Sequence, residues 1–464
     1  MIWVQKPYTV LMSALSQGIH KGPKLDVHVF RQEKPIPSYA VVIAVGSLRT
    51  KTLDEGISIF TEENIFRSTY VNDFHYTVIE TMLQIADELC GHCGLYVWGR
   101  YDICVLPPSI AHFEIECPCV TFISPTLLGG DRSYVSYSLA RNISQSWAGN
   151  FVTCENYQHL WLNKSFSLFI SRKIRRNVLY HDGIDAFHQW EGLENFNSLV
   201  QERKNVNKLR CLLPNLEYLS APDIATKYVS YERGYFLLCH LENILGGPTL
   251  FEPFLISYFR KFAYESINTK DWTDYLYKYF SNKKKMLDGV DLHSWFGDTF
   301  STPIMPHLLQ MSSLWEDKRF RLIKKWINSD NRVHNVPPPV TADDRNFCNV
   351  QKIILLNDLH SCYWSLTIEE LDRTYDNFFR GTKNGKIRFL WLLLCIKVRW
   401  ADKVALALNF ATEHCSPNYA CPIFQHLYEW EEMREEAIET YNRNKGKMLN
   451  ETREKIGQIL HQSL

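Results

Sequence analysis

Patterns typical of β-strands occur only in the first 124 residues of the chain, and helical periodicity dominates the remaining residues. A β-branched and apolar run extends from Pro35 to Leu48. Two shorter strands are predicted for residues 101–106 and 120–124, each ended by a proline that cannot donate to a sheet. Strands that precede a long succession of helices predict an α+β fold.

Helical stripes carry most of the remaining apolar residues. Leu139, Ile143 and Trp147 lie at i, i+4 and i+8, so they form one buried face of a helix that begins near Ser133 and ends before Gly149. The same periodicity predicts helices over 62–90, 160–170, 231–245, 250–262, 368–379, 387–398, 403–411 and 423–441. Successive amphipathic helices with short connections predict a helical stack in the last part of the chain.

Length and loop composition indicate several domains. A chain of 464 residues predicts about three domains at roughly 150 residues each. Glycine, serine, threonine and two prolines gather over residues 297–306, and 337–339 is the only run of three prolines. We therefore place a domain boundary near residue 300.

Charge and cysteine usage argue against several classes of function. The 51 basic and 51 acidic side chains balance, which disfavours a nucleic-acid partner and a polybasic membrane-surface protein. The longest apolar run, Phe389–Ile396, is too short to span a bilayer, and Met1–Gly22 lacks the features of a signal peptide. The 13 scattered cysteines indicate reduced thiols, so we expect a cytoplasmic protein. From the charge balance and the short apolar runs, we expect no membrane or nucleic-acid partner.

The segment with the clearest chemical signature lies between Arg141 and Ser165. Residues 141–153 read Arg-Asn-Ile-Ser-Gln-Ser-Trp-Ala-Gly-Asn-Phe-Val-Thr, and 161–165 read Trp-Leu-Asn-Lys-Ser. This pattern resembles the core of the zinc aminopeptidases of peptidase family M1, the family that includes leukotriene A-4 hydrolase. There, HExxH is followed by SWxGNxVT and WLNEG. Gln145 and Lys164 have 18 residues between them, as the second histidine and the glutamate do in the family.

The resemblance covers nearly the whole chain. Further similar segments are Pro35–Tyr39, Tyr96–Gly99, Val105–Ser109, Thr126–Asp131, Tyr231–Gly234, Leu245–Pro248, Ile387–Ile396 and Ala407–Glu413. It implies a thermolysin-like metallopeptidase domain over 51–300, preceded by a β-saddle remnant over 1–50. An all-α helical-repeat domain of the leukotriene A-4 hydrolase C-terminal type is expected over 301–464. Because the family's saddle domain is larger, missing strands would leave an exposed sheet edge, so we expect either an N-terminal truncation or a remnant that packs differently.

The zinc site implied by the resemblance has lost its chemistry. A catalytic zinc needs three lone-pair donors and a general base. Arg141, Gln145 and Lys164 stand at the three ligand positions, and Asn142 stands at the position of the base. A guanidinium and an ammonium offer no lone pair, an amide is a poor ligand, and Asn142 cannot accept a proton at neutral pH. We therefore predict no zinc and no other cofactor.

Other positions of the family's site are partly kept. By the resemblance, Glu116 matches the glutamate that grips the substrate amine, and Tyr231 matches the tyrosine that stabilises an oxyanion. Asp223 aligns with an acidic residue of the hydrolase pocket. Thr226 and Cys421 replace a pocket tyrosine and an arginine that recognises a substrate carboxylate. Catalytic groups act as a unit, so without a metal we expect Glu116 and Tyr231 to contribute only to packing and not to catalysis.

The two cations at the degenerate site have two interpretations. In the first, Arg141 and Lys164 bind a small anion together with Tyr231. In the second, they replace the lost charge of zinc and pair with Glu116 or Asp223. We favour the second, because buried charges need partners.

Three other features are assigned structural roles. Cys90, His92 and Cys93 with Cys117 and Cys119 could suggest a second metal site, but we favour free thiols. The remaining predictions are a buried aromatic core of Trp147, Trp161 and Phe166, and a solvated basic turn at Lys283–Lys285.

The resemblance leaves two functions open, beside a third alternative in which the gene product has no selected function. The first is a catalytically inactive relative of leukotriene A-4 hydrolase that binds a protein, through its helical C-terminal domain, or a small anion. The second is a zinc metalloaminopeptidase or epoxide hydrolase, as the family implies. Stoichiometric zinc would support the enzyme, and its absence would support binding.

Overall fold

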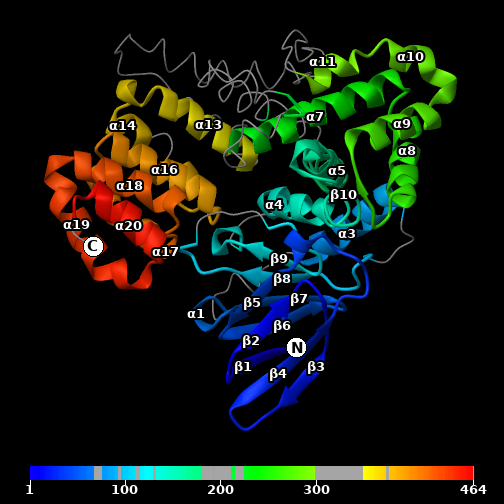
Figure 1. The fold of residues 1–464 in the computed structure, drawn as a ribbon. Helices are drawn as coiled ribbons and strands as arrows, with labels where there is room; N and C mark the ends of the chain where they lie inside the picture. The colour runs from blue at the N-terminus through cyan, green and yellow to red at the C-terminus, as the bar shows by residue number, and fades with distance from the viewer. Residues whose placement is uncertain are drawn as a thin grey trace.

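Three regions succeed one another along the chain in a computed structural model (Figure 1). The structure describes residues 1–66, 76–91, 96–110, 115–128, 132–179, 192, 211–214, 224–297, 349–372 and 376–462. N-terminal strands lead into a central region of mixed strands and helices, and helices alone form the described C-terminal elements. The predicted α+β class is confirmed. The boundary near residue 300 and the proline run at 337–339 lie outside the described residues.

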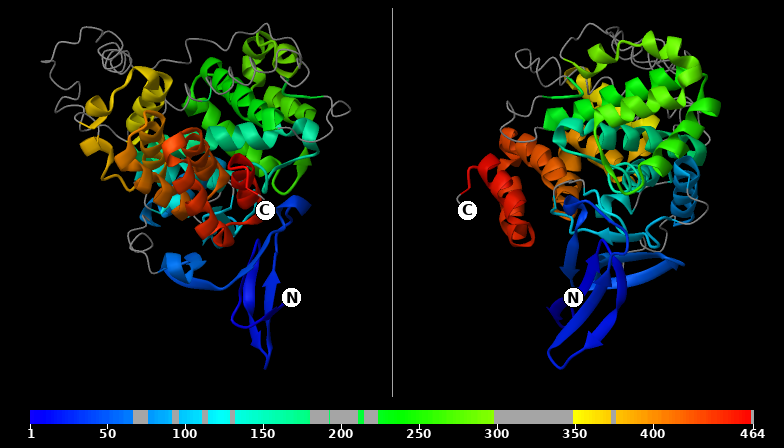
Figure 2. Two further views of the ribbon diagram at one scale, coloured as in Figure 1. Left: turned by 90° about the vertical axis from the view of Figure 1, so that its left-hand side faces the viewer. Right: turned by 45° about the vertical axis from the view of Figure 1, so that its right-hand side comes forward.

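The N-terminal region consists of two small antiparallel sheets, in the orders β1-β4-β3 and β2-β5. Their bounds are β1 Ile2–Gln5, β2 Thr9–Met12, β3 Leu15–Lys21, β4 Leu25–Arg31 and β5 Ile43–Gly46. The β pattern expected over 35–48 is confirmed only for β5, because a 3-10 turn at Ser38–Ala40 follows Pro37. Proline fixes φ and lacks an amide donor, so it suits a turn better than a sheet. Figure 2 shows that these strands project away from the rest of the molecule.

The central region is built on a four-stranded mixed sheet in the order β6-β7-β8-β9. Its bounds are β6 Leu48–Asp54, β7 Ile57–Glu62, β8 Asp102–Val105 and β9 Val120–Ile123. The strands predicted for 101–106 and 120–124 are confirmed as β8 and β9. Parallel strands need a crossover, and helix α3 (Tyr76–Cys90) lies between β7 and β8 in the chain. Of the helical region expected over 62–90, the structure describes α1 (Glu63–Phe66) and α3, and residues 67–75 lie outside the described residues.

Helices α4, α5 and α7 pack on one another above this sheet in Figure 1. The helices are α4 Arg132–Gln145, α5 Trp161–Leu179, α7 Ile224–Ile244, α8 Pro248–Lys261, α9 Thr269–Tyr279, α10 Lys284–Asp288 and α11 Leu292–Phe296. A two-residue parallel pair, β10 (Thr153–Cys154) with β11 (Ser266–Ile267), ties the start of α5 to α9. The predicted stripe of Leu139, Ile143 and Trp147 is fully buried, as are Trp161 and Phe166, which confirms their core role.

The C-terminal region is a stack of helices with its own apolar core. Its helices are α13 Asn349–Ser361, α14 Ile368–Leu371, α15 Asn377–Phe379, α16 Gly385–Lys397, α17 Val404–Glu413, α18 Pro417–Glu429, α19 Arg434–Asn444 and α20 Asn450–Ile459. The single helix expected over 423–441 is wrong. Trp430 has an extended backbone and a buried indole, so the chain turns there between α18 and α19. Of the helix expected over 368–379, the structure describes α14 and α15, and residues 373–375 between them lie outside the described residues.

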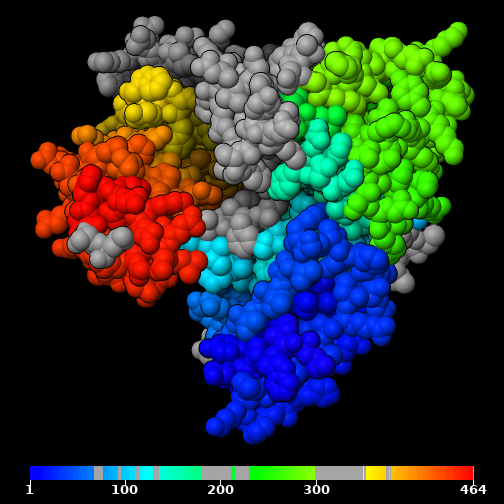
Figure 3. Space-filling view, viewed as in Figure 1, coloured from blue at the N-terminus to red at the C-terminus, as the bar shows by residue number. Residues whose placement is uncertain are grey.

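The helical region contacts the central region through small polar and glycine residues. Thr452 on α20 donates a hydrogen bond of 2.9 Å to the carbonyl of Ser109. A Cβ at Gly385 would lie 3.0 Å from Thr126, so α16 begins in close contact with the turn after β9. Figure 3 shows the helical region and the N-terminal strands bordering the central region on one face. None of the helices that the structure describes is both long enough and apolar enough to cross a membrane.

Candidate functional site

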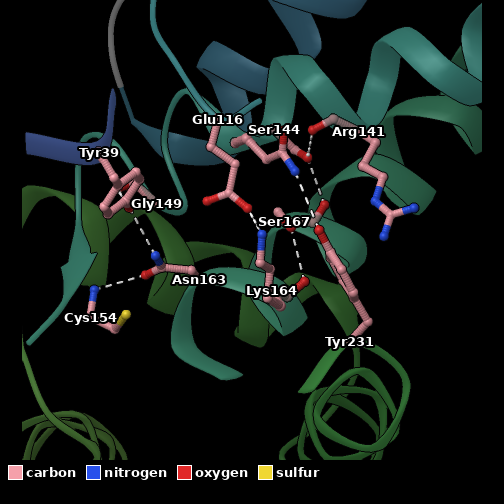
Figure 4. Close-up of polar contacts among 11 residues, drawn as sticks. Tyr39, Glu116, Arg141, Ser144, Gly149, Cys154, Asn163, Lys164, Ser167 and Tyr231 are labelled. Carbon is pink, nitrogen blue, oxygen red and sulfur yellow. Dashed lines mark hydrogen bonds and ion pairs between the residues drawn. The ribbon is translucent and has the colours of Figure 1, made fainter. Parts of the chain in front are cut away.

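Five of the predicted site residues come together between α4, α5, α7 and the loop before β9 (Figure 4). Arg141 and Gln145 lie one turn apart on α4, and Lys164 lies in the first turn of α5. Tyr231 faces them from α7, and Glu116 reaches them from the loop. The spacing between the family's motifs therefore brings the same set of positions together in this chain.

The centre of this site is an ion pair between Lys164 and Glu116. The Lys164 ammonium contacts Glu116 Oε1, and the two side chains are only 8% and 9% exposed. The same ammonium lies 5.3 Å from the ring centroid of Tyr231. Pairing of the cations with Glu116 or Asp223 was favoured over the binding of a small anion, and the structure pairs Lys164 with Glu116. The ion pair has little solvent around it to screen it.

Arg141 and Gln145 contact opposite parts of the Tyr231 side chain. The guanidinium carbon of Arg141 lies 4.0 Å from the ring centroid, a cation–π contact. The Gln145 amide donates a hydrogen bond of 3.4 Å to the Tyr231 hydroxyl, and both residues are 1% exposed. The hydroxyl that the resemblance assigns to an oxyanion is thus held by a side-chain amide. Asn142 lies half-buried on the same helix.

Gly149 makes room for the Glu116 carboxylate. Its φ of +130° is one that side chains rarely adopt. A Cβ at this position would lie 3.1 Å from Glu116 Oε2 and 3.7 Å from the Asn163 amide nitrogen. Glycine is therefore required both by the backbone and by the close approach of the carboxylate.

Tyr39 joins the N-terminal strands to this site, a role that the sequence patterns did not indicate. Its hydroxyl donates to the Gly149 carbonyl at 2.6 Å and accepts from the Asn163 amide at 3.1 Å. Asn163 in turn accepts from the backbone amide of Cys154 at 2.8 Å. The ring of Tyr39 is half exposed, but desolvation at its hydroxyl end raises the pKa of Tyr39 well above its usual range, so the hydroxyl keeps its proton. The only sequence signal was its place in the similar segment Pro35–Tyr39.

Small residues hold the helices of the site close together. The Ser144 hydroxyl lies 2.7 Å from the carbonyls of both Arg141 and Ser167, which links α4 to α5. A Cβ at Gly234 on α7 would overlap the Ser165 side chain, so α5 and α7 can approach only with glycine there. These contacts keep the three helices in fixed positions relative to one another.

The residues at the ligand positions do not fit a zinc ion. The ammonium of Lys164 is bound to Glu116, and the guanidinium of Arg141 lies over Tyr231. Of the three former ligand positions, only Gln145 has an oxygen to offer, and an amide oxygen is a weak donor for zinc. In the part of the chain that the structure describes, no group of three or more His, Cys, Asp or Glu side chains could hold a metal.

The cysteines considered for a second metal site are free thiols where they are described. Cys90, Cys117 and Cys119 are buried and unbridged. Burial raises the pKa of both Cys117 and Cys119 to about 12, so neither is a thiolate at neutral pH. His92 and Cys93 lie outside the described residues.

Several other predicted positions lie apart from the site or cannot be placed. Asp223 and the side chain of Thr226 lie outside the described residues. Cys421 is half-buried on α18 in the helical region. Lys284 and Lys285 are exposed at the start of α10, as expected for a solvated basic turn, whereas Lys283 is half-buried and its ammonium donates to the Leu245 carbonyl at 2.7 Å.

Comparison with known proteins agrees with this geometry. The Peptidase family M1 domain matches residues 74–295, and the Leukotriene A4 hydrolase C-terminal domain matches residues 347–460. The fold and the frame of the site define this chain as a member of peptidase family M1.

Its similarity to leukotriene A-4 hydrolases extends over almost all of its length. The Xenopus laevis leukotriene A-4 hydrolase is 33% identical over 462 residues, which cover 99% of this chain and 73% of that protein. Leucine aminopeptidase 2 of Candida glabrata is 32% identical over 70% of this chain and 48% of its own length. The structure of yeast LTA4 hydrolase in complex with bestatin matches 99% of this chain and 73% of its own at 25% identity and a TM-score of 0.81.

Substituting Glu116 is expected to reveal whether Arg141, Lys164 and Tyr231 bind an anion. In the wild type the Glu116 carboxylate already neutralises Lys164, so an added anion must compete with it. In Glu116→Gln the ammonium becomes available, and phosphate should raise the melting temperature more than in the wild type. Lys164→Met in the same background should abolish the additional rise. Equal rises in all three proteins would place the anion elsewhere.

Proposed function

We propose that this chain is a zinc-free, catalytically inactive member of the family that acts by binding. The observation that carries the proposal is the buried Lys164–Glu116 ion pair, which places an ammonium where the family has a metal ligand. The neighbouring Arg141 guanidinium adds a second positive charge that would repel a divalent cation. The chemistry of Asn142 removes the general base as well.

The alternative, an aminopeptidase or an epoxide hydrolase, rests on the family membership alone. Glu116, the counterpart of the amine-binding glutamate, has an internal ammonium as its partner, and the Tyr231 hydroxyl accepts from Gln145. Catalytic groups that act as a unit lose most of their effect when members are missing. We further propose a cytoplasmic location, because the 13 scattered cysteines are typical of reduced thiols.

Metal content and turnover of the purified full chain test this proposal together. We expect less than stoichiometric zinc by elemental analysis, and no hydrolysis of aminoacyl anilides above background, because a missing general base alone costs about 10²–10⁴-fold. Tyr231→Phe should change neither result. One zinc per chain that is lost in Gln145→Ala, or a turnover that is lost in Tyr231→Phe, would refute the proposal.

A further inference from the structure

An exposed pair of aromatic side chains lies on the turn between α13 and α14. Trp364 is 75% exposed and Tyr363 is 36% exposed on the 3-10 turn Tyr363–Ser365. Their rings meet edge to face, with centroids 5.7 Å apart. Large aromatic side chains are normally buried, so this pair, and Trp364 above all, presents apolar area to solvent.

Lys397, the last residue of α16, completes this surface with a positive charge. Its ammonium lies 5.3 Å from the ring centroid of Tyr363. Partial burial lowers the pKa of Lys397, and no carboxylate of the described residues forms an ion pair with it. Lys397 therefore offers a positive charge beside the aromatic pair, and a carboxylate that approaches it would gain a charge-assisted contact.

The two histidines near Lys397 add no positive charge beside it at neutral pH. His360 contacts the Leu390 carbonyl at 2.8 Å, and burial lowers its pKa to about 4, so it is neutral. Burial also lowers the pKa of His426, which contacts Glu429 at 3.3 Å. Because its pKa is lowered, His426 does not neutralise Glu429, and none of the ion pairs among the described residues joins Glu429 to Lys397.

We infer that the surface formed by Tyr363, Trp364 and Lys397, the Trp364 surface, binds an acidic peptide segment of a partner protein. A carboxylate of the segment provides the counter-ion that Lys397 lacks, and an adjacent apolar side chain packs on Trp364. Tyrosine and tryptophan offer contact area at a low cost in side-chain entropy. This inference rests on the proposed function, because it names the class of partner for a chain that acts by binding.

Fluorescence anisotropy with a labelled peptide of alternating Glu and Phe tests the inference on the full chain. We expect saturable binding that weakens at least roughly tenfold in Trp364→Ala and in Lys397→Gln. Two matched controls are Trp3→Ala, which removes a tryptophan that is 67% exposed on β1, and Lys285→Gln on the solvated basic turn. Both controls should bind like the wild type.

Several results would overturn the inference. These are an absence of binding by the wild type, equal binding of a peptide in which Gln replaces every Glu, and equal loss in the control variants. Tighter binding of a single-stranded oligonucleotide that depends on Trp364 would assign the surface to another class of partner. Unchanged circular dichroism of each variant excludes unfolding as the cause. Zinc and turnover in a chain that still binds the peptide through Trp364 would refute the proposed function alone.

Discussion

Lys164→Met is expected to lower the free energy of unfolding by roughly 3–5 kcal/mol, because it leaves the buried Glu116 carboxylate without its counter-ion. Glu116→Gln should be destabilising for the reciprocal reason, since the ammonium of Lys164 then lies beside a neutral amide. Urea denaturation of each variant, followed by circular dichroism, measures the loss.

A double variant separates the ion pair from simple packing. In Lys164→Met/Glu116→Gln no unpaired charge remains, so the loss should be clearly smaller than the sum of the two single losses. Lys270→Met is the matched control, because it breaks the exposed pair with Asp274 and should change stability little. Additive losses in the double variant would show that the two side chains do not depend on each other for their burial.

The second large effect is expected from rebuilding the zinc site. Arg141→His, Asn142→Glu, Gln145→His and Lys164→Glu would restore two imidazoles, a carboxylate ligand and a base, and would remove two positive charges. Residues 141 and 145 already lie one turn apart on α4, and Lys164 faces them from α5. The quadruple variant should therefore bind zinc. Zinc at about a thousand times its dissociation constant would stabilise the fold by about 4 kcal/mol.

Thermal unfolding with and without zinc, together with elemental analysis, measures this gain. A triple variant that keeps Lys164 is the matched control, and it should gain little because the ammonium repels the ion. Peptidase activity should stay low in the quadruple variant, because Cys421 stands where the resemblance places a substrate-binding arginine. A folded quadruple variant without zinc would show that the supporting contacts around the ligands have also changed.

The chemistry of neighbouring residues alone was enough to predict much of the fold and to recognise that the zinc-ligand residue types are missing. The stripe of Leu139, Ile143 and Trp147 could be recognised because helical periodicity is a property of neighbouring residues, and all three are fully buried. The donor chemistry of Arg141 and Lys164 is fixed by the residue types themselves, whatever surrounds them.

Periodicity could not predict where the long C-terminal helix is interrupted. The apolar spacing continues across residues 423–441, yet Trp430 leaves the helical conformation. Burying a large indole in the core of the helical stack outweighs the hydrogen bonds of one more turn, and that balance depends on neighbours distant in the sequence.

The partner of each charge in the site was decided only by the tertiary structure. From the sequence, the partner of the Lys164 ammonium could be a bound anion, Glu116 or Asp223. Sequence neighbours do not show which of two carboxylates far apart along the chain lies beside it in the fold. The structure brings the loop before β9 onto α5, where Gly149 leaves space for the Glu116 carboxylate. Tyr39 likewise reaches Gly149 and Asn163 across more than a hundred residues. The sequence determined which side chains cannot hold zinc, and the packing of α4, α5 and α7 decided which charges neutralise one another, because a buried ion is stable only beside the partner that the fold supplies.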